Sequence, residues 1–391
     1  MTTIGFVVGE PSGDRIGADL IRALRNQADG ELHVVGLGGE AMQAEGLTSL
    51  FDIHELSIIG IGAIVARLPQ LLRRVSQTAD FIVDAKPDAL VIIDSPTFSH
   101  RVAKRVRARL PQVPIANYIP PTVWAWREGR AAAMRPYVDH AICALPFEPD
   151  TMRRLGGPPA TYVGHPLMTT PALRQIMEEA NPPAADRTPV SPPTLLILPG
   201  SRRGEINRLI DDFGATFQRL RSMMPGLTAI IPTLERHRPI IEAKIAHWEN
   251  KPMVVTGEAA KWATFAKADA AIAASGTVSL ELALADVPMA LAYRLDPIGY
   301  RFRHLISAWT AALPNFIAGH PLVPEHFHEF VRPELLARRL QRLLTDTPER
   351  RAQLAGFAEI RAAMAIDCPP GEAAADIVLD LVRQGRPTNP T

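Results

Sequence analysis

Short runs of β-branched and aliphatic residues alternate with helical patterns along most of the chain, and this alternation is the strongest constraint on its fold. The runs of the first half lie at residues 3–10, 33–39, 88–94, 114–119 and 140–145. Parallel strands need long crossover connections, usually helices, so repeated strand–helix–strand order implies a parallel sheet covered on both faces. The first half therefore predicts one doubly wound α/β domain.

The composition then changes, because residues 181–193 contain five of the chain's 36 prolines. Many prolines and little periodicity are typical of a linker. Strand patterns resume at 194–200, 227–233, 252–257, 270–275 and 288–293. We therefore predict an α/β chain of two Rossmann-like domains with a ligand cleft between them. We predict domains at 1–174 and 195–349, a linker at 175–194 and a tail at 384–391. Helices at about 350–383 are candidates to pack back on the first domain.

Charge and cysteine content exclude several classes of function. Lys and Arg number 42 and Asp and Glu 41, so no net positive field predicts nucleic acid as a partner. Cys143 and Cys368 provide neither a disulfide framework nor metal-ligand spacing, so we predict buried thiols and no metal site. The first residues carry no signal-peptide pattern. The longest uncharged apolar run, Leu56–Ala66, is shorter than the ~20 residues of a spanning helix. These features predict a cytoplasmic protein and leave a peripheral membrane contact open.

The first strand pattern ends in the turn VVGEPSGDRIG, residues 7–17. Glu10 stands at the carboxyl end of the strand, and Ser12 or Asp14 is predicted to cap a helix over Ser12–Arg25. The spacing fits neither G-x-G-x-x-G nor a P-loop, so neither site is predicted. A structural turn and a ligand-binding turn both remain open here.

A second acidic strand end lies in VIIDSPTFSHR, residues 91–101. The buried strand pattern ends at Asp94, and Thr97 follows three residues later. Reactive groups in parallel sheets lie at the carboxyl ends of the strands. Asp94 is therefore our first candidate for a general base and Glu10 the second.

Two turns of the second half have the character of phosphate sites. In LLILPGSRRGEINR, residues 195–208, Arg202 and Arg203 open a helix, where the helix dipole disfavours cations unless an anion compensates. A phosphate held by backbone N–H groups, Ser201 and an arginine would remove that conflict. Two solvated arginines are the alternative.

In AIAASGTVSLELALADVP, residues 271–288, Ser275, Gly276 and Thr277 precede a helix that carries Glu281 one turn in. Gly276 permits close approach of a phosphate, and Glu281 is suited to accept hydrogen bonds from a ribose. A surface glutamate is the alternative. Together, the two turns predict a nucleoside-diphosphate site.

Two further segments suggest contact with sugar or lipid. Trp124, Trp126 and Arg127 lie close together in YIPPTVWAWREGR, although alternate aromatics are as often core residues. In IIGIGAIVARLPQLLRRV, residues 58–75, an apolar stripe at helical spacing is edged by arginines, which suits an anionic bilayer or, alternatively, a core-facing helix. The stripe consists of Ile61, Ile64, Val65, Leu68, Leu71, Leu72 and Val75.

The order and spacing of these motifs resemble the lipid-A-disaccharide synthase family over roughly residues 5–381. The motifs are GEPSGD, GIGAIVARLPQLLRR, IDSPTF, PTVWAWR, FEP with YVGHPL, LPGSRRGEI, ASGTVSLELAL, LPNFIAG and VPE. The resemblance implies a GT-B fold and inverting transfer of diacylglucosamine from a UDP donor to diacylglucosamine 1-phosphate. It also implies a peripheral enzyme on the cytoplasmic face of the inner membrane, without a metal or other cofactor, and leaves a homodimer open. The donor-side residues that it implies are Gly200, Ser201, Arg202, Ser275, Gly276, Thr277, Glu281, Asn315 and Glu325; the acceptor or membrane side has the apolar stripe with Trp124, Trp126 and Arg127.

The chain departs from the family's usual motifs at positions in predicted loops. Thr97 stands where the family usually has the aspartate expected to act as general base, and a threonine hydroxyl does not accept a proton near neutral pH. Pro11, Pro120 and His328 replace an alanine, a serine and a glutamine of the usual motifs. A synthase would then use Asp94 or Glu10, with His100 close by. A transferase with another acceptor and a silent binding paralogue are the alternatives. An epimerase of the same fold would leave the apolar stripe and the tryptophans unexplained.

Overall fold

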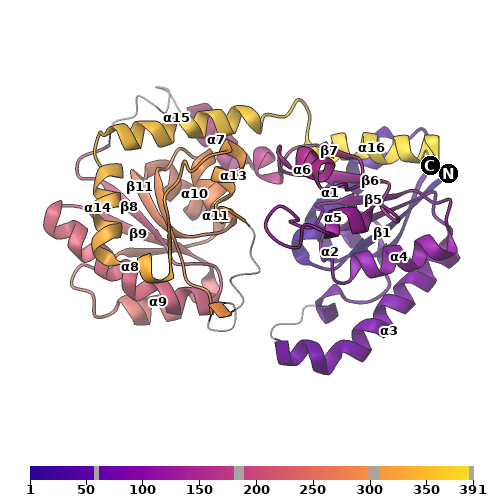
Figure 1. Cartoon of the computed structure of the whole chain (residues 1–391), viewed down its shortest axis with the longest axis horizontal. Helices are drawn as coiled ribbons and strands as arrows, with labels where there is room; N and C mark the ends of the chain where they lie inside the picture. Colours follow the sequence, from indigo (N-terminus) through magenta and orange to yellow (C-terminus); the bar gives the residue numbers. More distant parts are fainter. Residues whose placement is uncertain (57–60, 180–188, 297–299, 302–307, 387–391) are drawn as a thin grey trace. The chain divides into compact units, whose positions relative to one another are not determined.

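A computed structural model describes residues 1–56, 61–179, 189–296, 300–301 and 308–386, except for the side chains of 61–68. The chain forms two compact units, drawn in Figure 1: residues 1–166 with 366–391, and residues 167–365. The first boundary falls eight residues before the predicted 174, and only the last helix belongs to the first unit. The two-domain α/β organisation predicted from the strand patterns is confirmed.

The first unit contains a seven-stranded, all-parallel sheet in the order β3-β2-β1-β4-β5-β6-β7. β4 is apolar throughout and β1 from Ile4 onward, because helices cover both faces of the sheet. The strands are β1 (Thr2–Val8), β2 (Leu32–Leu37), β3 (Thr48–Ser49), β4 (Ala89–Ile93), β5 (Ile115–Tyr118), β6 (His140–Cys143) and β7 (Ala160–Tyr162).

Helices pack on the two faces of this sheet in two separate clusters. On one face α1 (Pro11–Gln27) contacts α16 (Pro370–Gln384), and on the other α3 (Ile61–Ala85) contacts α4 (Ser99–Arg109). Val378 and Leu379 of α16 lie in the same cluster as Leu20 and Leu24 of α1, so the last helix completes this core. The remaining helices are α2 (Glu40–Ala44), α5 (Arg130–Met134) and α6 (Glu148–Arg154).

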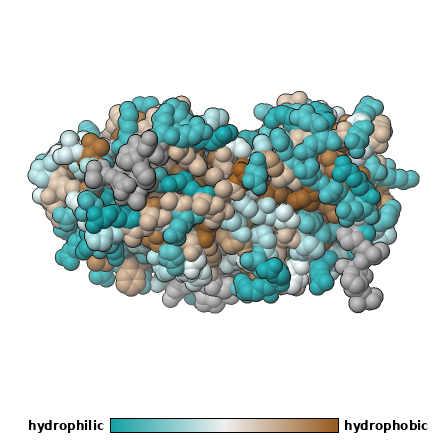
Figure 2. Space-filling model, turned by 90° about the horizontal axis from the view of Figure 1, so that it is seen from above, coloured by the Kyte–Doolittle hydropathy of each residue, from teal (hydrophilic) through white to brown (hydrophobic). Residues whose placement is uncertain are grey.

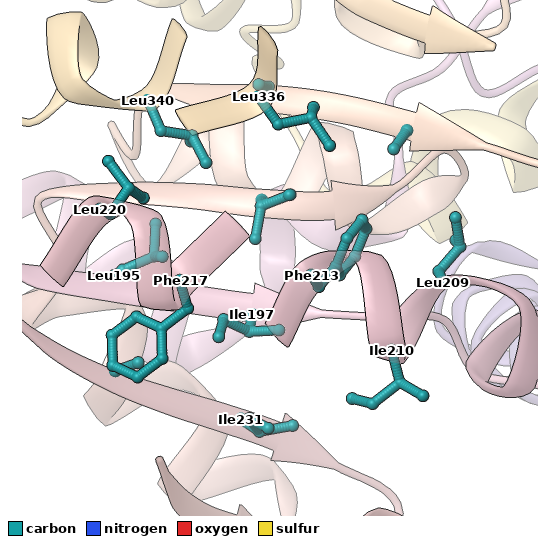
Figure 3. Packing of buried hydrophobic residues seen from close by; sticks show 14 of the residues in the cluster. Leu195, Ile197, Leu209, Ile210, Phe213, Phe217, Leu220, Ile231, Leu336 and Leu340 are labelled. Atoms are coloured by element: carbon teal, nitrogen blue, oxygen red, sulfur yellow. The ribbon is translucent and has the colours of Figure 1, made fainter. Parts of the chain in front are cut away.

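The second unit contains a six-stranded parallel sheet in the order β10-β9-β8-β11-β12-β13. Figure 3 shows leucine, isoleucine and phenylalanine side chains of α8 and α14 in one cluster with Leu195 and Ile197 of β8 and Ile231 of β9. The strands are β8 (Thr194–Leu198), β9 (Thr228–Thr233), β10 (Met253–Thr256), β11 (Ala270–Ala274), β12 (Met289–Tyr293) and β13 (Glu325–Phe327). The helices are α7 (Pro171–Glu179), α8 (Arg203–Met223), α9 (Arg238–Ile245), α10 (Glu258–Lys267), α11 (Thr277–Leu284), α13 (Leu313–Ala318), α14 (Pro333–Leu343) and α15 (Pro348–Ala363).

Several local features differ from the sequence prediction. Residues 175–179 of the predicted linker form the end of α7, while 180–188 lie outside the described residues. The edge strands β3, β7 and β13 are only two or three residues long, so they have no recognisable apolar run. Glu10 occupies the N-cap position of α1 without a side-chain capping hydrogen bond, Pro11 follows it, and Ser12 and Asp14 lie within the helix.

The surface drawn in Figure 2 is mostly hydrophilic, with hydrophobic residues scattered among polar ones. Across the described ranges, no helix is both long and apolar enough to cross a bilayer. Cys143 is buried, as predicted, whereas Cys368 is half-exposed.

Candidate functional site

The order of the strands brings the predicted site residues to one edge of each sheet. In both units the strand order reverses beside the first strand, at β1/β4 and at β8/β11. Ligands of doubly wound folds bind at the carboxyl ends of the strands at such a switch point. Glu10 and Asp94 follow β1 and β4, and the two predicted phosphate turns follow β8 and β11.

The turns after β1 and β4 are in direct contact. A Cβ added to Gly9 would lie 2.5 Å from the hydroxyl oxygen of Ser95, so only glycine allows this approach. Asp94 and Ser95 both have left-handed backbone angles, with φ of 50° and 47°. Such angles are unusual for residues with a side chain and turn Asp94 sharply at the strand end.

The Asp94 carboxylate is half-buried and has two hydrogen-bond donors within the described chain. The Ser95 N–H donates to Oδ1 at 2.7 Å, and the Ser12 hydroxyl lies 3.3 Å from Oδ2. The longer contact is weak, because the two oxygens of an O–H···O hydrogen bond usually lie about 2.5–3.0 Å apart. Oδ2 is therefore the oxygen with most capacity to accept a further proton.

Asp14 has a structural role that its position in the glycine turn did not reveal. Its carboxylate accepts hydrogen bonds from the backbone N–H groups of Gly39, Ala41 and Met42, at 2.7, 2.9 and 3.2 Å. It thereby satisfies the free N–H groups at the start of α2. Asp14 joins α1 to α2 instead of capping its own helix.

Two other residues of this edge differ in accessibility. Thr97 is exposed on the turn between β4 and α4. His100 is buried, with Nδ1 2.9 Å from the Tyr137 hydroxyl. Burial, together with Arg130 and Lys104, lowers the pKa of His100 to about 4. His100 is therefore a neutral residue of the interior near pH 7, not an accessible base.

The segment after β5 is anchored by Trp124. Its indole N–H donates to Glu148 Oε1 at 3.1 Å, and its ring packs edge-on against Phe147 at 5.4 Å. The other oxygen of Glu148 accepts from the N–H groups of Ala144 and Leu145 at 3.2 and 3.0 Å. Burial raises the pKa of Glu148 to about 7 despite these hydrogen bonds. Trp124 is thus a packing residue that fixes the loop.

Trp126 has a different environment, because its side chain is 41% exposed. The guanidinium carbons of Arg127 and Arg130 lie 4.4 and 4.9 Å from its ring centroid. Both distances are within the range of a cation–π interaction. The loop therefore presents one aromatic ring and two cations to solvent.

The turn after β8 is already occupied by a carboxylate. Gly200 has a φ of 119°, and the N–H groups of Ser201 and Arg202 donate to Glu205 Oε2 at 3.1 and 3.2 Å. Arg202 also pairs with Glu205 Oε1 at 2.8 Å. These two N–H groups are thus bonded within the chain, and phosphate binding by this turn stays a prediction. The Ser201 side chain and most of the Arg202 side chain remain exposed.

The turn after β11 is open. Among the described residues, a Cβ added to Gly276 would meet no further atom within 4 Å, and Thr277 is exposed. Ser275 donates its hydroxyl to the backbone oxygen of Ala311 at 2.9 Å. The N–H groups that begin a helix have no intrahelical partners, so this turn at the start of α11 is a candidate anion site.

Glu281 lies one turn into α11 and pairs with Lys261, whose Nζ is 3.1 Å from both carboxylate oxygens. This pairing was not predicted, since the two residues are on different helices. It leaves Glu281 able to accept a ribose hydroxyl while Lys261 offsets its charge.

Asn315 is buried and Glu325 is half-buried, and the two belong to one hydrogen-bonded network. The Asn315 amide nitrogen lies 3.1, 3.0 and 3.2 Å from Thr310 Oγ1, the Val323 backbone oxygen and Glu325 Oε2, and its oxygen accepts from the Val323 N–H at 2.7 Å. Glu325 also accepts from the Thr310 hydroxyl and from the Ala311 N–H at 2.9 Å. Both residues therefore hold the segment that bonds to Ser275.

The apolar stripe falls on α3, which contacts α4. Ile61, Ile64, Val65 and Leu68 lie on the helix, but their side chains are outside the described part. Leu71 packs partly against the core, and Leu72 is 41% exposed. Arg74 pairs with Glu55 at 2.6 Å and stacks on Phe51 at 4.3 Å, so it is not available to a bilayer.

Solved structures with this arrangement define the class of protein. A UDP-GlcNAc 2-epimerase from Neisseria meningitidis is 13% identical, with a TM-score of 0.59 over 98% of this chain and 100% of that one. MurG of Acinetobacter baumannii is 15% identical, with a TM-score of 0.58 over 97% and 100%. At these identities the likeness concerns the fold, and the fold is GT-B, as predicted.

Sequence comparison identifies the family. A family model described as lipid-A-disaccharide synthetase matches residues 4–369. A lipid-A-disaccharide synthase from Rhodopseudomonas palustris (strain HaA2) is 47% identical over 97% of this chain and 96% of its own length. One from Rhodospirillum centenum is 38% identical over 97% and 94%. The chain belongs to the lipid-A-disaccharide synthase family of glycosyltransferases, and the predicted family and enzyme class are confirmed.

Proposed function

We propose that the chain transfers diacylglucosamine from UDP-2,3-diacylglucosamine to 2,3-diacylglucosamine 1-phosphate and releases UDP. The acceptor 6-hydroxyl loses its proton and bonds to the anomeric carbon, whose bond to the UDP oxygen breaks with inversion to give the β-1,6 disaccharide. The observation that carries the proposal is the pair of turns after β8 and β11, which are adjacent strands at the point where the strand order reverses. The family match of the chain gives this pair its meaning. The UDP–sugar named in the related epimerase structure is consistent with this assignment.

On the donor side we assign the diphosphate to the open turn after β11. Gly276 and Thr277 present the start of α11, where backbone N–H groups and the helix dipole favour an anion. Leu198 of β8 pairs with Ala273 of β11, so the turn that carries Ser201 and Arg202 lies next to the turn after β11. The exposed Arg202 guanidinium is suited to stabilise the charge of the departing UDP. Glu281 would accept hydrogen bonds from the ribose.

On the acceptor side we assign the general base to Asp94, with Glu10 as the second candidate. Support comes from the sharp backbone at Asp94 and from the weak 3.3 Å contact at Oδ2, which leaves that oxygen able to accept a proton. General base catalysis contributes about 10²–10⁴-fold to a rate. Loss of the usual aspartate at Thr97 would therefore reduce turnover without abolishing donor binding.

Both substrates carry acyl chains, so the enzyme would act at a membrane surface. We propose a peripheral contact through α3 with the cytoplasmic face of the inner membrane. Exposure of Leu72 on this helix supports the proposal. An amphipathic helix edged with arginine is typical of such contacts.

A paired turnover assay tests the function. The purified chain is given both lipid substrates in detergent, and UDP release and disaccharide mass are followed together, beside Asp94→Asn, Glu10→Gln and Thr97→Asp. We expect disaccharide from the unmodified chain and a loss of about 10²–10⁴-fold in Asp94→Asn. Glu128→Gln, on an exposed loop of the same unit, is the matched control. Absence of disaccharide in every variant would refute the assignment.

Thr97 supports a second candidate, a transferase that keeps the UDP-sugar donor and uses another acceptor, or a silent paralogue. The residue is exposed on the turn between β4 and α4, where a substitution alters the acceptor side alone. UDP binding without disaccharide would favour this candidate. Activity that appears only in Thr97→Asp would mean that the scaffold has lost its base.

A further inference from the structure

One exposed cluster of the first unit carries positive charge that no acid within the described ranges balances. It comprises Trp126, Arg127 and Arg130, and we call it the arginine–tryptophan cluster. Both guanidinium groups lie against the same indole ring, at 4.4 and 4.9 Å. Neither arginine forms an ion pair with any described residue, and Glu128 of the same turn pairs with neither.

The surroundings of the cluster add to its charge. Lys104 lies 5.0 Å over the ring of Tyr137, and Lys104 and Arg130 both act to lower the pKa of His100. Burial and the neighbouring Arg127 lower the pKa of Arg130, which means that the two guanidinium groups repel each other. Cation–π contacts at exposed sites contribute only about 0.5–1 kcal/mol each. An anion bound between the arginines would remove the repulsion.

The cluster is also held rigidly. Trp124, two residues before Trp126, is bonded to buried Glu148 and packed on Phe147. Arg127 has a left-handed φ of 55°, a backbone state that its anchored neighbours maintain. The two guanidinium groups therefore extend from an anchored loop, so little backbone entropy is lost when a ligand binds.

We propose that the arginine–tryptophan cluster is a binding subsite for the phosphomonoester of the acceptor lipid. A phosphomonoester carries about −1.5 to −2 charge near pH 7, which matches two guanidinium groups, and its oxygens fit the planar fork of arginine. The indole supplies the apolar surface that an amphiphilic sugar lipid needs. This inference rests on the proposed function, because the reaction defines the acceptor.

The place of the cluster in the sheet fits this ligand. It follows β5, which pairs with β4, so its loop leaves the same carboxyl edge as Asp94. The acceptor carries its phosphate and its reacting hydroxyl on one sugar ring. A phosphate subsite at the same edge of the sheet as the proposed base would therefore orient the ring for transfer.

Binding of two lipids that differ only in the phosphate tests the proposal. Short-chain diacylglucosamine 1-phosphate and its dephosphorylated form are titrated into the full chain in one detergent by calorimetry. We expect the unmodified chain to prefer the phosphorylated lipid by about ten- to a hundredfold, as for hydrogen bonds to charged groups. Arg127→Gln or Arg130→Gln should each reduce that preference about tenfold, and Arg127→Lys should retain part of it.

Arg135→Gln is the matched control, since Arg135 is exposed at the end of the same helix and stacks on no ring in the described chain. Equal loss in Arg135→Gln, or an unchanged preference in both cluster variants, would refute the subsite. Phosphatidylglycerol vesicles form a second arm. If the cluster variants lose vesicle binding but keep the phosphate preference, the cluster contacts bilayer phosphodiesters instead, and the proposal is overturned.

The assay of disaccharide formation separates this inference from the proposed function. If the unmodified chain makes no disaccharide but prefers the phosphorylated lipid, and the cluster variants lose that preference, the proposed function is refuted and the subsite is supported. A chain that makes disaccharide and shows equal affinity for the two lipids would support the function and refute the subsite.

Discussion

Glu148 should make the stability of the first unit depend on pH near neutrality. The carboxyl group is 5% exposed, and burial raises its pKa from 4.5 to about 7. A carboxyl group with a raised pKa binds more protons in the folded state than in the unfolded state. Stability therefore falls as the pH rises from about 4.5 through about 7, and stays constant above that range.

The magnitude follows from the difference between the two pKa values. One pKa unit corresponds to about 1.4 kcal/mol, so complete ionisation of Glu148 costs on the order of 3 kcal/mol. Between pH 5 and pH 8 the unmodified chain should lose about 2–3 kcal/mol from this group. Glu148→Gln should lack this loss, although it also weakens the Trp124 contact by about 1 kcal/mol at every pH.

Urea unfolding at several pH values, read by hydrogen exchange in peptides of β5 and β6, measures the first unit on its own. The difference in unfolding free energy between the unmodified chain and Glu148→Gln should change by about 2–3 kcal/mol between pH 5 and pH 8. Glu128→Gln, an exposed substitution in the same unit, should show no such change. Parallel pH profiles for the unmodified chain and Glu148→Gln would refute the reasoning.

Three further substitutions have defined outcomes. Gly9→Ala should cost about 1–3 kcal/mol and reduce turnover, because the new methyl group collides with Ser95. Gly129→Ala, whose methyl group would meet no further described atom within 4 Å, is the control for urea unfolding. Gly276→Ala should leave stability unchanged but weaken UDP binding at least about tenfold by calorimetry, since it fills the space proposed for phosphate. Asn315→Ala should destabilise the second unit by about 2–4 kcal/mol in urea, because it leaves buried polar partners unpaired.

Contrary results would identify which step fails. Unchanged stability in Gly9→Ala would mean that the two turns separate easily. Normal UDP affinity in Gly276→Ala would move the diphosphate away from the β11 turn. A small effect of Asn315→Ala would mean that water replaces its hydrogen bonds.

The sheets could be predicted because buried parallel strands are apolar along their whole length. Val91, Ile92 and Ile93 show this pattern in β4, and every residue of that strand is buried. The short strand β13 could not be predicted, since its three residues are all half-buried. Its place in the sheet depends on Asn315 and Glu325, which bond to residues elsewhere in the chain.

The sequence predicted where the site residues lie in the fold, but it did not always predict which residues they bond to. A carboxylate and a phosphate satisfy the same N–H donors at the start of a helix, so the turn at Ser201 gave no indication that Glu205 fills it. Glu148 lies in the FEP motif, yet its partner Trp124 stands 24 residues earlier. The cation pair at Arg127 and Arg130 was visible in sequence, whereas their shared contact with Trp126 required the fold.

The return of the chain to the first unit affects the order of events during synthesis. Residues 167–365 form a continuous unit, whereas the first unit needs α16, which is synthesised only after the whole of the second unit. At about 5–20 residues per second, the sheet of residues 1–166 would wait on the order of ten seconds or more for that helix. During this interval the α1 face, with Leu20 and Leu24, lacks its cover. Nascent chains stalled before residue 366 should therefore be the form that chaperones recognise.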